Sequence, residues 1–264
     1  VQPASWVPMA VIAMGQTLTT LNISALPVLI GAMVDEFSIA PTTVASAIVI
    51  YSIAVSGFIM LGAKLGQKYG STTIFRCSTI LLLLAAAMTA SSNSFRWLLV
   101  AQGLSGLGAA MLLPSLVVLI TDNYSGHQQA KAIGLLGGVQ AAATVATILI
   151  AGLVGTHLGW RYSFGLIVPF AALTWLLSYR LKSSEKQLDL KIDRMGAVLA
   201  ALAIGLISLG FNFINEWGPI RAFATAPSGP LGISPALLMI LLGMLGMQLF
   251  IVWVQHRKKV NKAP

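Results

Sequence analysis

The sequence has few charged residues: 9% of its 264 residues are Asp, Glu, Lys or Arg, against about 25% in an ordinary soluble domain. Hydrophobic residues make up 57%. Uncharged windows of at least 18 residues occur eight times, at 1–34, 37–63, 77–95, 97–121, 132–160, 162–179, 195–215 and 222–256. Each window is long enough to cross the hydrocarbon core of a bilayer as a helix. The composition therefore excludes a soluble domain and predicts an all-α integral membrane protein with eight membrane-spanning helices.

The sequence also has little that could carry catalysis or bind a metal. Its single cysteine, Cys77, lies in an apolar segment, where one thiol cannot form a disulfide within the chain. The run Gly103-x-x-Gly106-x-Gly108 resembles a phosphate-binding loop, but no strand precedes it. There is no Ser/His/Asp set, no pair of carboxylates and no His/Cys cluster with metal-ligand spacing. We therefore expect that the protein is not an enzyme and has no cofactor and no metal site.

The net charge of +9 could indicate a nucleic-acid partner, but its distribution favours a membrane orientation. With eight helices, both termini lie on the same side. If that side is the cytoplasm, it holds thirteen of the sixteen Lys and Arg residues, and only Arg96, Arg161 and Arg221 lie outside. This asymmetry follows the positive-inside rule. We expect a plasma-membrane protein with both termini in the cytoplasm, surrounded by the lipid bilayer and without a nucleic-acid partner.

The most polar stretch, 182–194, divides the predicted helices into two groups. Six are expected before it, at about 7–33, 42–63, 72–91, 99–123, 130–158 and 161–181, and two after it, at about 195–215 and 233–256. We therefore expect a six-helix bundle at 1–181, a cytoplasmic basic and polar linker at 182–194, and two additional helices with a basic tail at 195–264. The first residue is Val1 rather than Met, so we also expect residues upstream.

Four polar side chains inside the predicted helices are candidates for lining an aqueous cavity: Asn22, Gln102, Gln140 and Thr144. The alternative is that Asn22 joins two helices by hydrogen bonding and that the threonines of the first helix bond to their own backbone. Small residues at spacing four indicate close contact between helices. Those with a predicted packing role are Gly106, Gly108, Gly134, Gly138 and Gly152, and Ala142 and Ala146 continue the stripe that begins at Gly134.

Several short motifs, taken in order, resemble the amino-terminal half of a major facilitator superfamily transporter. Ala25-Leu26-Pro27 is similar to the end of the first-helix signature, and Gln102 to Ala110 to the helix-four pattern R-x-x-Q-G-x-G-x-A. The loop signature G-x-L-x-D-R-x-G-R-R falls on a segment that includes Lys64, Gly66, Gln67, Lys68 and Gly70. Trp160–Phe164 resembles the entry to helix six, and Asp193–Gly196 the start of an extra helix. The resemblance extends to the 14-helix drug:proton antiporters. It implies a six-helix bundle plus two additional helices, and export of small molecules.

The charged positions of that family are mostly neutral in this chain. The loop aspartate is Gln67, the helix-four arginine is Gln102, and the helix-five antiporter signature keeps only Gly152 of its four residues. Proton coupling requires a group that titrates, such as a carboxylate embedded in the membrane. In the first predicted helix no Asp or Glu precedes Asp35.

Two functions are therefore open. The chain is half of an exporter, needing a second bundle to form a pathway, or it is a transport-inactive scaffold or regulatory subunit of a larger membrane complex. Six further helices after Pro264 would support the first, and a stop codon there the second. The sequence does not identify a substrate.

Overall fold

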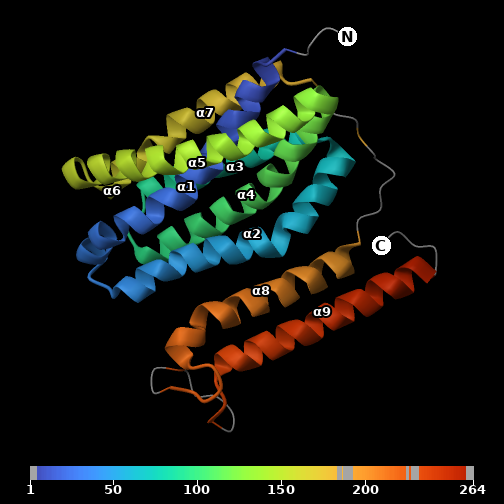
Figure 1. The fold of residues 1–264 in the computed structure, drawn as a ribbon. Helices are drawn as coiled ribbons and strands as arrows, with labels where there is room; N and C mark the ends of the chain where they lie inside the picture. Colours follow the sequence, from blue (N-terminus) through green and yellow to red (C-terminus); the bar gives the residue numbers. More distant parts are fainter. Residues whose placement is uncertain (1–4, 183–185, 187–192, 224–225, 227–231, 260–264) are drawn as a thin grey trace.

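The computed structural model describes residues 5–182, 186, 193–223, 226 and 232–259. Within these residues the chain is helical, and eight helical segments are long and apolar enough to cross a membrane (Figure 1). The predicted all-α membrane fold with eight spans is confirmed. Most of the predicted linker at 182–194 lies outside the described residues.

The six segments before the linker form α1 (Val7–Phe37), α2 (Pro41–Tyr69), α3 (Ser71–Ala90), α4 (Phe95–Asn123), α5 (Gly126–His157) and a final interrupted helix. Pro41 begins α2, because proline needs no hydrogen-bonded N–H in the first turn and its φ already suits a helix. Gly70 ends α2 with φ 90°, a backbone conformation that favours glycine. Its N–H donates to the Gly66 carbonyl at 2.9 Å.

The sixth predicted span, 161–181, is confirmed as one membrane span at Trp160–Arg180, but its helix is interrupted. The segment forms α6 (Trp160–Gly165), α7 (Ile167–Leu177) and the 3₁₀ turn η1 (Ser178–Arg180). Pro169 explains the break, because a proline cannot donate to the carbonyl four residues before it and its ring collides with that group. That carbonyl belongs to Gly165, the residue at which α6 ends.

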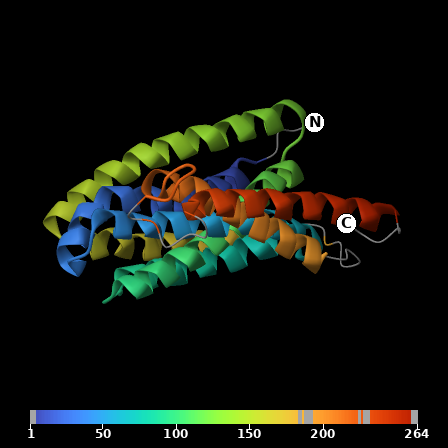
Figure 2. The same ribbon diagram turned by 90° about the horizontal axis from the view of Figure 1, so that it is seen from below.

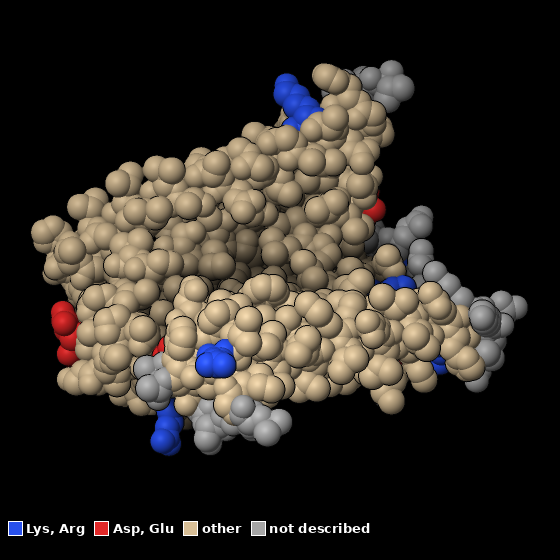
Figure 3. Space-filling model, turned by 60° about the horizontal axis from the view of Figure 1, so that its bottom comes forward, with Lys and Arg blue, Asp and Glu red and all other residues tan. Residues whose placement is uncertain are grey.

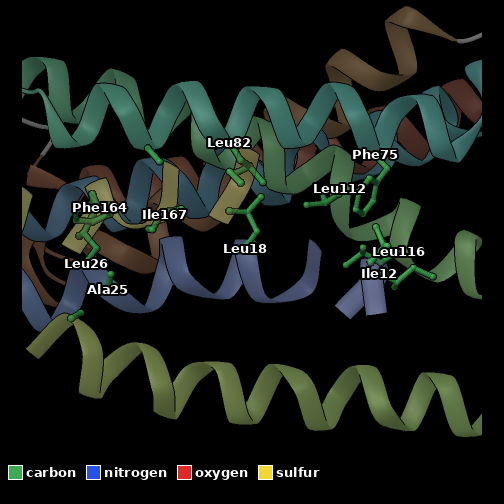
Figure 4. Close-up of a cluster of buried hydrophobic side chains, with 14 of the residues drawn as sticks. Ile12, Leu18, Ala25, Leu26, Phe75, Leu82, Leu112, Leu116, Phe164 and Ile167 are labelled. Atoms are coloured by element: carbon green, nitrogen blue, oxygen red, sulfur yellow. The ribbon is translucent and has the colours of Figure 1, made fainter. Parts of the chain in front are cut away.

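The core of the bundle forms where α1, α3, α4, α6 and α7 meet. Figure 4 shows side chains from these helices pointing toward one another. Fully or almost fully buried members are Ile12, Leu18, Phe75, Leu82, Leu112, Leu116, Phe164 and Ile167. By contrast, α5 runs along one edge of the molecule (Figure 2), and only 11% of its most apolar window is buried inside the chain.

The two additional helices, α8 (Arg194–Trp217) and α9 (Pro235–Lys259), form a hairpin whose first helix packs on α2 (Figure 1). Asp193 links the start of α8 to the last turns of α9. The carboxylate accepts a hydrogen bond from the Gly196 N–H at 3.1 Å, which caps α8, and another from Trp253 Nε1 at 2.7 Å on α9. Arg257 Nε lies 3.8 Å from the same carboxylate.

Candidate functional site

A groove of about 450 Å³ lies where α1, α2, α4 and α5 approach one another. Its lining consists of Gln16, Ile59, Met60, Ala63, Leu113, Pro114, Val117 and Leu136. The face drawn in Figure 3 is hollowed along its middle, and the side chains visible in the hollow are neither Lys, Arg, Asp nor Glu. The groove is thus apolar, with the Gln16 amide as the polar group among these lining residues.

Gln16 is 5% exposed, and its backbone carbonyl accepts the hydroxyls of Thr19 at 2.8 Å and Thr20 at 2.9 Å. Thr17 donates in the same way to the Ala13 carbonyl at 2.9 Å. These threonines therefore bond to their own helix, as the alternative interpretation predicted. Their hydroxyls are satisfied, which leaves the Gln16 amide as the polar group that α1 presents to the groove.

None of the four predicted cavity-lining residues lines this groove. Asn22 and Gln102 are 0% and 1% exposed, inside the bundle. Within the described residues, both amide atoms of Asn22 and the Nε2 atom of Gln102 have no hydrogen-bond partner. Gln140 is exposed on α5, and the Thr144 hydroxyl donates to the Gln140 carbonyl at 2.9 Å. The polar run 16–24 indicates that this part of α1 can line a cavity, but it does not reveal that Gln16 is the residue that the helix turns toward the groove.

The residues of the loop signature occupy the last turns of α2 and the turn to α3. Gly66 is buried, whereas the side chains of Lys64 and Gln67 are exposed. Gly70 forms the turn itself. The segment thus places two cations, Lys64 and Lys68, and the Gln67 amide beside a glycine-dependent turn.

The small residues fall into two groups. A Cβ atom added to Gly106 would lie 2.5 Å from the Tyr51 carbonyl oxygen, and one added to Gly108 would lie 2.9 Å from Leu82 Cγ. These glycines let α4 approach α2 and α3 closely. Gly152 has only ordinary contact, with Val28 Cγ1 at 3.9 Å.

The stripe on α5 is open. Within the described chain nothing lies within 4 Å of a Cβ atom added to Gly134 or Gly138, and Ala142 and Ala146 are exposed. The close contact expected of this stripe is therefore not made inside the described part of the chain. Contact with a helix of another bundle stays a prediction.

Comparison with known proteins gives the same family as the motifs. The model of the Major Facilitator Superfamily matches residues 12–261. The methylenomycin A resistance protein of Bacillus subtilis is 25% identical over 199 residues, which are 75% of this chain and 43% of that protein. The riboflavin transporter RibZ of Clostridioides difficile is 23% identical over 245 residues, covering 90% of this chain and 51% of the relative. The cephamycin export protein CmcT of Amycolatopsis lactamdurans is 23% identical over 214 residues, or 80% and 44% of the two chains.

Among solved structures, a crystal structure of the peptide transporter POT in complex with sulfate aligns with a TM-score of 0.65 and 13% identity, over 99% of this chain and 70% of that one. The auto-inhibited POT family peptide transporter aligns with a TM-score of 0.62 and 16% identity, over 97% and 54%. At these identities the likeness shows the fold alone. The chain spans about half or less of the length of the curated relatives described above. With a family match over nearly all of its length, this chain belongs to the Major Facilitator Superfamily.

Proposed function

We propose that this chain is half of an exporter of small molecules, with residues 1–181 as one transport bundle and the groove at Gln16 as one wall of the pathway. The observation that carries the proposal is the groove itself, a concave apolar surface of about 450 Å³ built by α1, α2, α4 and α5. Transporter sites form between two bundles, so the opposite wall requires a second bundle. Three relatives whose names describe resistance, transport or export support this function.

The uncovered stripe of α5 supports the need for a second bundle. Helices in lipid associate through small residues that let their backbones approach, and Gly134 and Gly138 have open space around them within the described chain. A helix from a second six-helix bundle, in the same polypeptide or another subunit, would cover this face. Residues 182–194 would then connect the bundle to the α8–α9 hairpin.

The lining of the groove limits the class of substrate. Cationic ligands need a carboxylate or an aromatic face in a site of low polarity, and the lining residues include neither. An apolar wall with one amide suits neutral or weakly polar molecules, which the amide can orient. The charge distribution further supports a plasma-membrane protein with both termini in the cytoplasm.

Efflux from cells tests this proposal. The native gene is expressed together with the second bundle that the proposal requires, in bacteria that lack their own multidrug pumps, and accumulation of a neutral fluorescent dye is measured. We expect expressing cells to accumulate less dye than cells with an empty vector. Val117→Trp, which fills the groove, should restore accumulation. The neighbouring Val118→Trp is the control, because Val118 is 38% exposed and is not among the lining residues.

Equal accumulation with and without the protein, at normal membrane levels, would contradict the exporter and favour the scaffold. Co-purification then identifies what covers α5. A second facilitator bundle supports the half-transporter, and an unrelated membrane subunit supports the scaffold.

A further inference from the structure

A second cavity, of about 230 Å³, lies between α2 and the α8–α9 hairpin at the end of the molecule where α2 finishes and α8 begins. The two helices touch further along: a Cβ atom on Gly57 would lie 3.4 Å from the Ala201 carbonyl oxygen, and one on Gly205 would lie 3.6 Å from Ile53. Toward the end of α2 they no longer fill the space between them. The result is a wedge-shaped opening on the surface that faces lipid in a membrane protein.

The wedge is apolar in depth and charged at its mouth. Apolar lining residues are Met60, Leu61, Ala63, Ala197, Ala200, Phe250 and Val254, with Gly196 beside them. Its polar lining residues are Lys64, Gln67 and Asp193. Drug-sized ligands occupy pockets of roughly 300–1,000 Å³, so a volume of about 230 Å³ suits a slender chain instead.

The two charges at the mouth are not equivalent. The Asp193 side chain is 8% exposed and is engaged by Trp253, by the Gly196 N–H and by Arg257. Lys64 is exposed and makes no ion pair within the residues that the structure describes. Lys68 follows one turn later on α2. Within the described residues, the wedge therefore presents one ammonium group without an anion, that of Lys64, beside its apolar lining.

We propose that this wedge binds an anionic phospholipid, with one acyl chain between α2 and the hairpin and the phosphate against Lys64. The chemistry is complementary at both ends of the lipid. The methylenes of its acyl chain would pack against Phe250 and Val254, and its phosphate would supply an anion for Lys64. The basic end of a membrane protein lies where anionic lipid headgroups gather. A lipid in this position would join the hairpin to the six-helix bundle, whether or not the protein transports anything.

Native mass spectrometry of the purified full chain tests the proposal. The protein is equilibrated in detergent with equal amounts of phosphatidylglycerol and phosphatidylcholine of the same acyl composition, and the retained lipid is counted. We expect one phosphatidylglycerol to be retained in preference. Lys64→Gln should reduce its retention about fivefold, the effect of ~1 kcal/mol per basic residue near an anionic surface. Lys131→Gln, at the same end but on α5, should leave retention unchanged.

A second pair of variants tests the wedge without changing charge. Ala197→Phe fills the cavity and should abolish preferential retention, whereas Ala141→Phe, on the exposed surface of α5, should not. Thermal unfolding of each variant confirms that it is folded. Equal loss in Lys64→Gln and Lys131→Gln would show general electrostatic attraction and overturn the site. Unchanged retention in Ala197→Phe, or equal retention of the two lipids by the native chain, would also overturn it.

Discussion

Glu36, in the last turn of α1, forms an ion pair with Arg161 at the start of α6, 125 residues away in the chain. The other Glu36 oxygen accepts the Trp160 indole N–H at 2.5 Å, and Arg161 also donates to the Ser92 carbonyl at 2.6 Å. These contacts join α1, α6 and the turn between α3 and α4 at one end of the bundle. No motif or residue spacing in the sequence predicts these contacts.

Removing this link should weaken the bundle modestly. The two side chains are 42% and 30% exposed, and ion pairs so exposed contribute roughly 0.2–1 kcal/mol. We expect Glu36→Gln to lower the midpoint of thermal unfolding in detergent by a few degrees at most, and less in high salt. Asp35→Asn removes the same charge one residue earlier, where the described residues show no ion pair, and should have no effect. Equal midpoints for the two variants would mean that the link adds no stability.

Tyr124, after the end of α4, secures the start of α1. Its hydroxyl accepts the Met9 N–H at 3.0 Å and donates to the Ser5 carbonyl at 3.0 Å. Tyr124→Phe leaves the buried Met9 N–H without its partner and should destabilise the protein by about 1–3 kcal/mol. Tyr162→Phe is the control, because Tyr162 is 64% exposed. Equal unfolding midpoints for these variants would contradict the role of Tyr124.

The same residue gives the effect of Tyr124→Phe a defined pH dependence. Burial raises the pKa of Tyr124 above its usual value of 10.0, although the hydrogen bond from Met9 acts in the opposite direction. Because the folded state favours the neutral phenol, its stabilising contribution is complete below pH 10.0 and falls as the pH rises above that value. The stability difference between wild type and Tyr124→Phe should therefore be constant through neutral pH and shrink in strong alkali.

The glycines of α4 and α5 should respond oppositely to the same substitution. Gly106→Ala places a methyl group 2.5 Å from the Tyr51 carbonyl oxygen, and such overpacking costs on the order of 1–3 kcal/mol. Gly134→Ala meets nothing within 4 Å in the described chain and improves helix propensity. We expect a lower unfolding midpoint for the first and an equal or higher one for the second. A loss of stability in Gly134→Ala would show that α5 already has a partner in the purified protein.

The eight membrane spans could be predicted from sequence, because lipid requires long apolar helices and little else produces them. The rotation of each helix could not, since hydropathy looks alike on every side of a buried span. Asn22 and Gln16 lie six residues apart in one polar run of α1 and on different sides of the helix, and only Gln16 lines the groove. The small residues of α4 and α5 likewise signal close contact without naming the partner. The sequence contains Pro169, but whether this proline kinks or breaks its helix depends on which group donates a hydrogen bond to the Gly165 carbonyl instead.

Substitutions of Asn22 test whether its buried amide stabilises the fold. Its two amide atoms are fully buried without partners in the described structure, and each such group costs about 1–3 kcal/mol. Asn22→Leu, of similar volume, should therefore leave the thermal unfolding midpoint unchanged or raise it. Asn22→Ala removes the same amide but leaves a cavity and should lower it. Destabilisation by Asn22→Leu would show that the amide is paired, for instance through a buried water.

Proton coupling depends on where the titratable groups lie. Every Asp, Glu and His of the described helices is in a terminal turn: Asp35, Glu36, Asp122, His127, His157, Glu216 and His256. A proton relay through the membrane needs a carboxylate or histidine at depth, and the residues that the motif resemblance matches to the family's arginine and aspartate are Gln102 and Gln67. We therefore expect this chain, reconstituted alone in proteoliposomes, to move neither protons nor a cationic dye under an imposed pH gradient.

The absence of proton and dye flux should hold from about pH 5.5 to 8. Histidine is the side chain that ordinarily changes charge in this range, and none lies at depth in the described helices. Proton flux is read with a trapped pH-sensitive dye, and a protonophore shows that the gradient is intact. Gln102→Ala serves as the paired variant, because Gln102 is 1% exposed and the sequence resemblance matches it to the arginine of the helix-four pattern. Flux that follows the gradient in the native chain and disappears in Gln102→Ala would overturn this prediction, since the Asp, Glu and His residues of α4 are limited to Asp122 in its last turn, far from Gln102. If flux appears only after a second facilitator bundle is added, the titrating group belongs to that bundle.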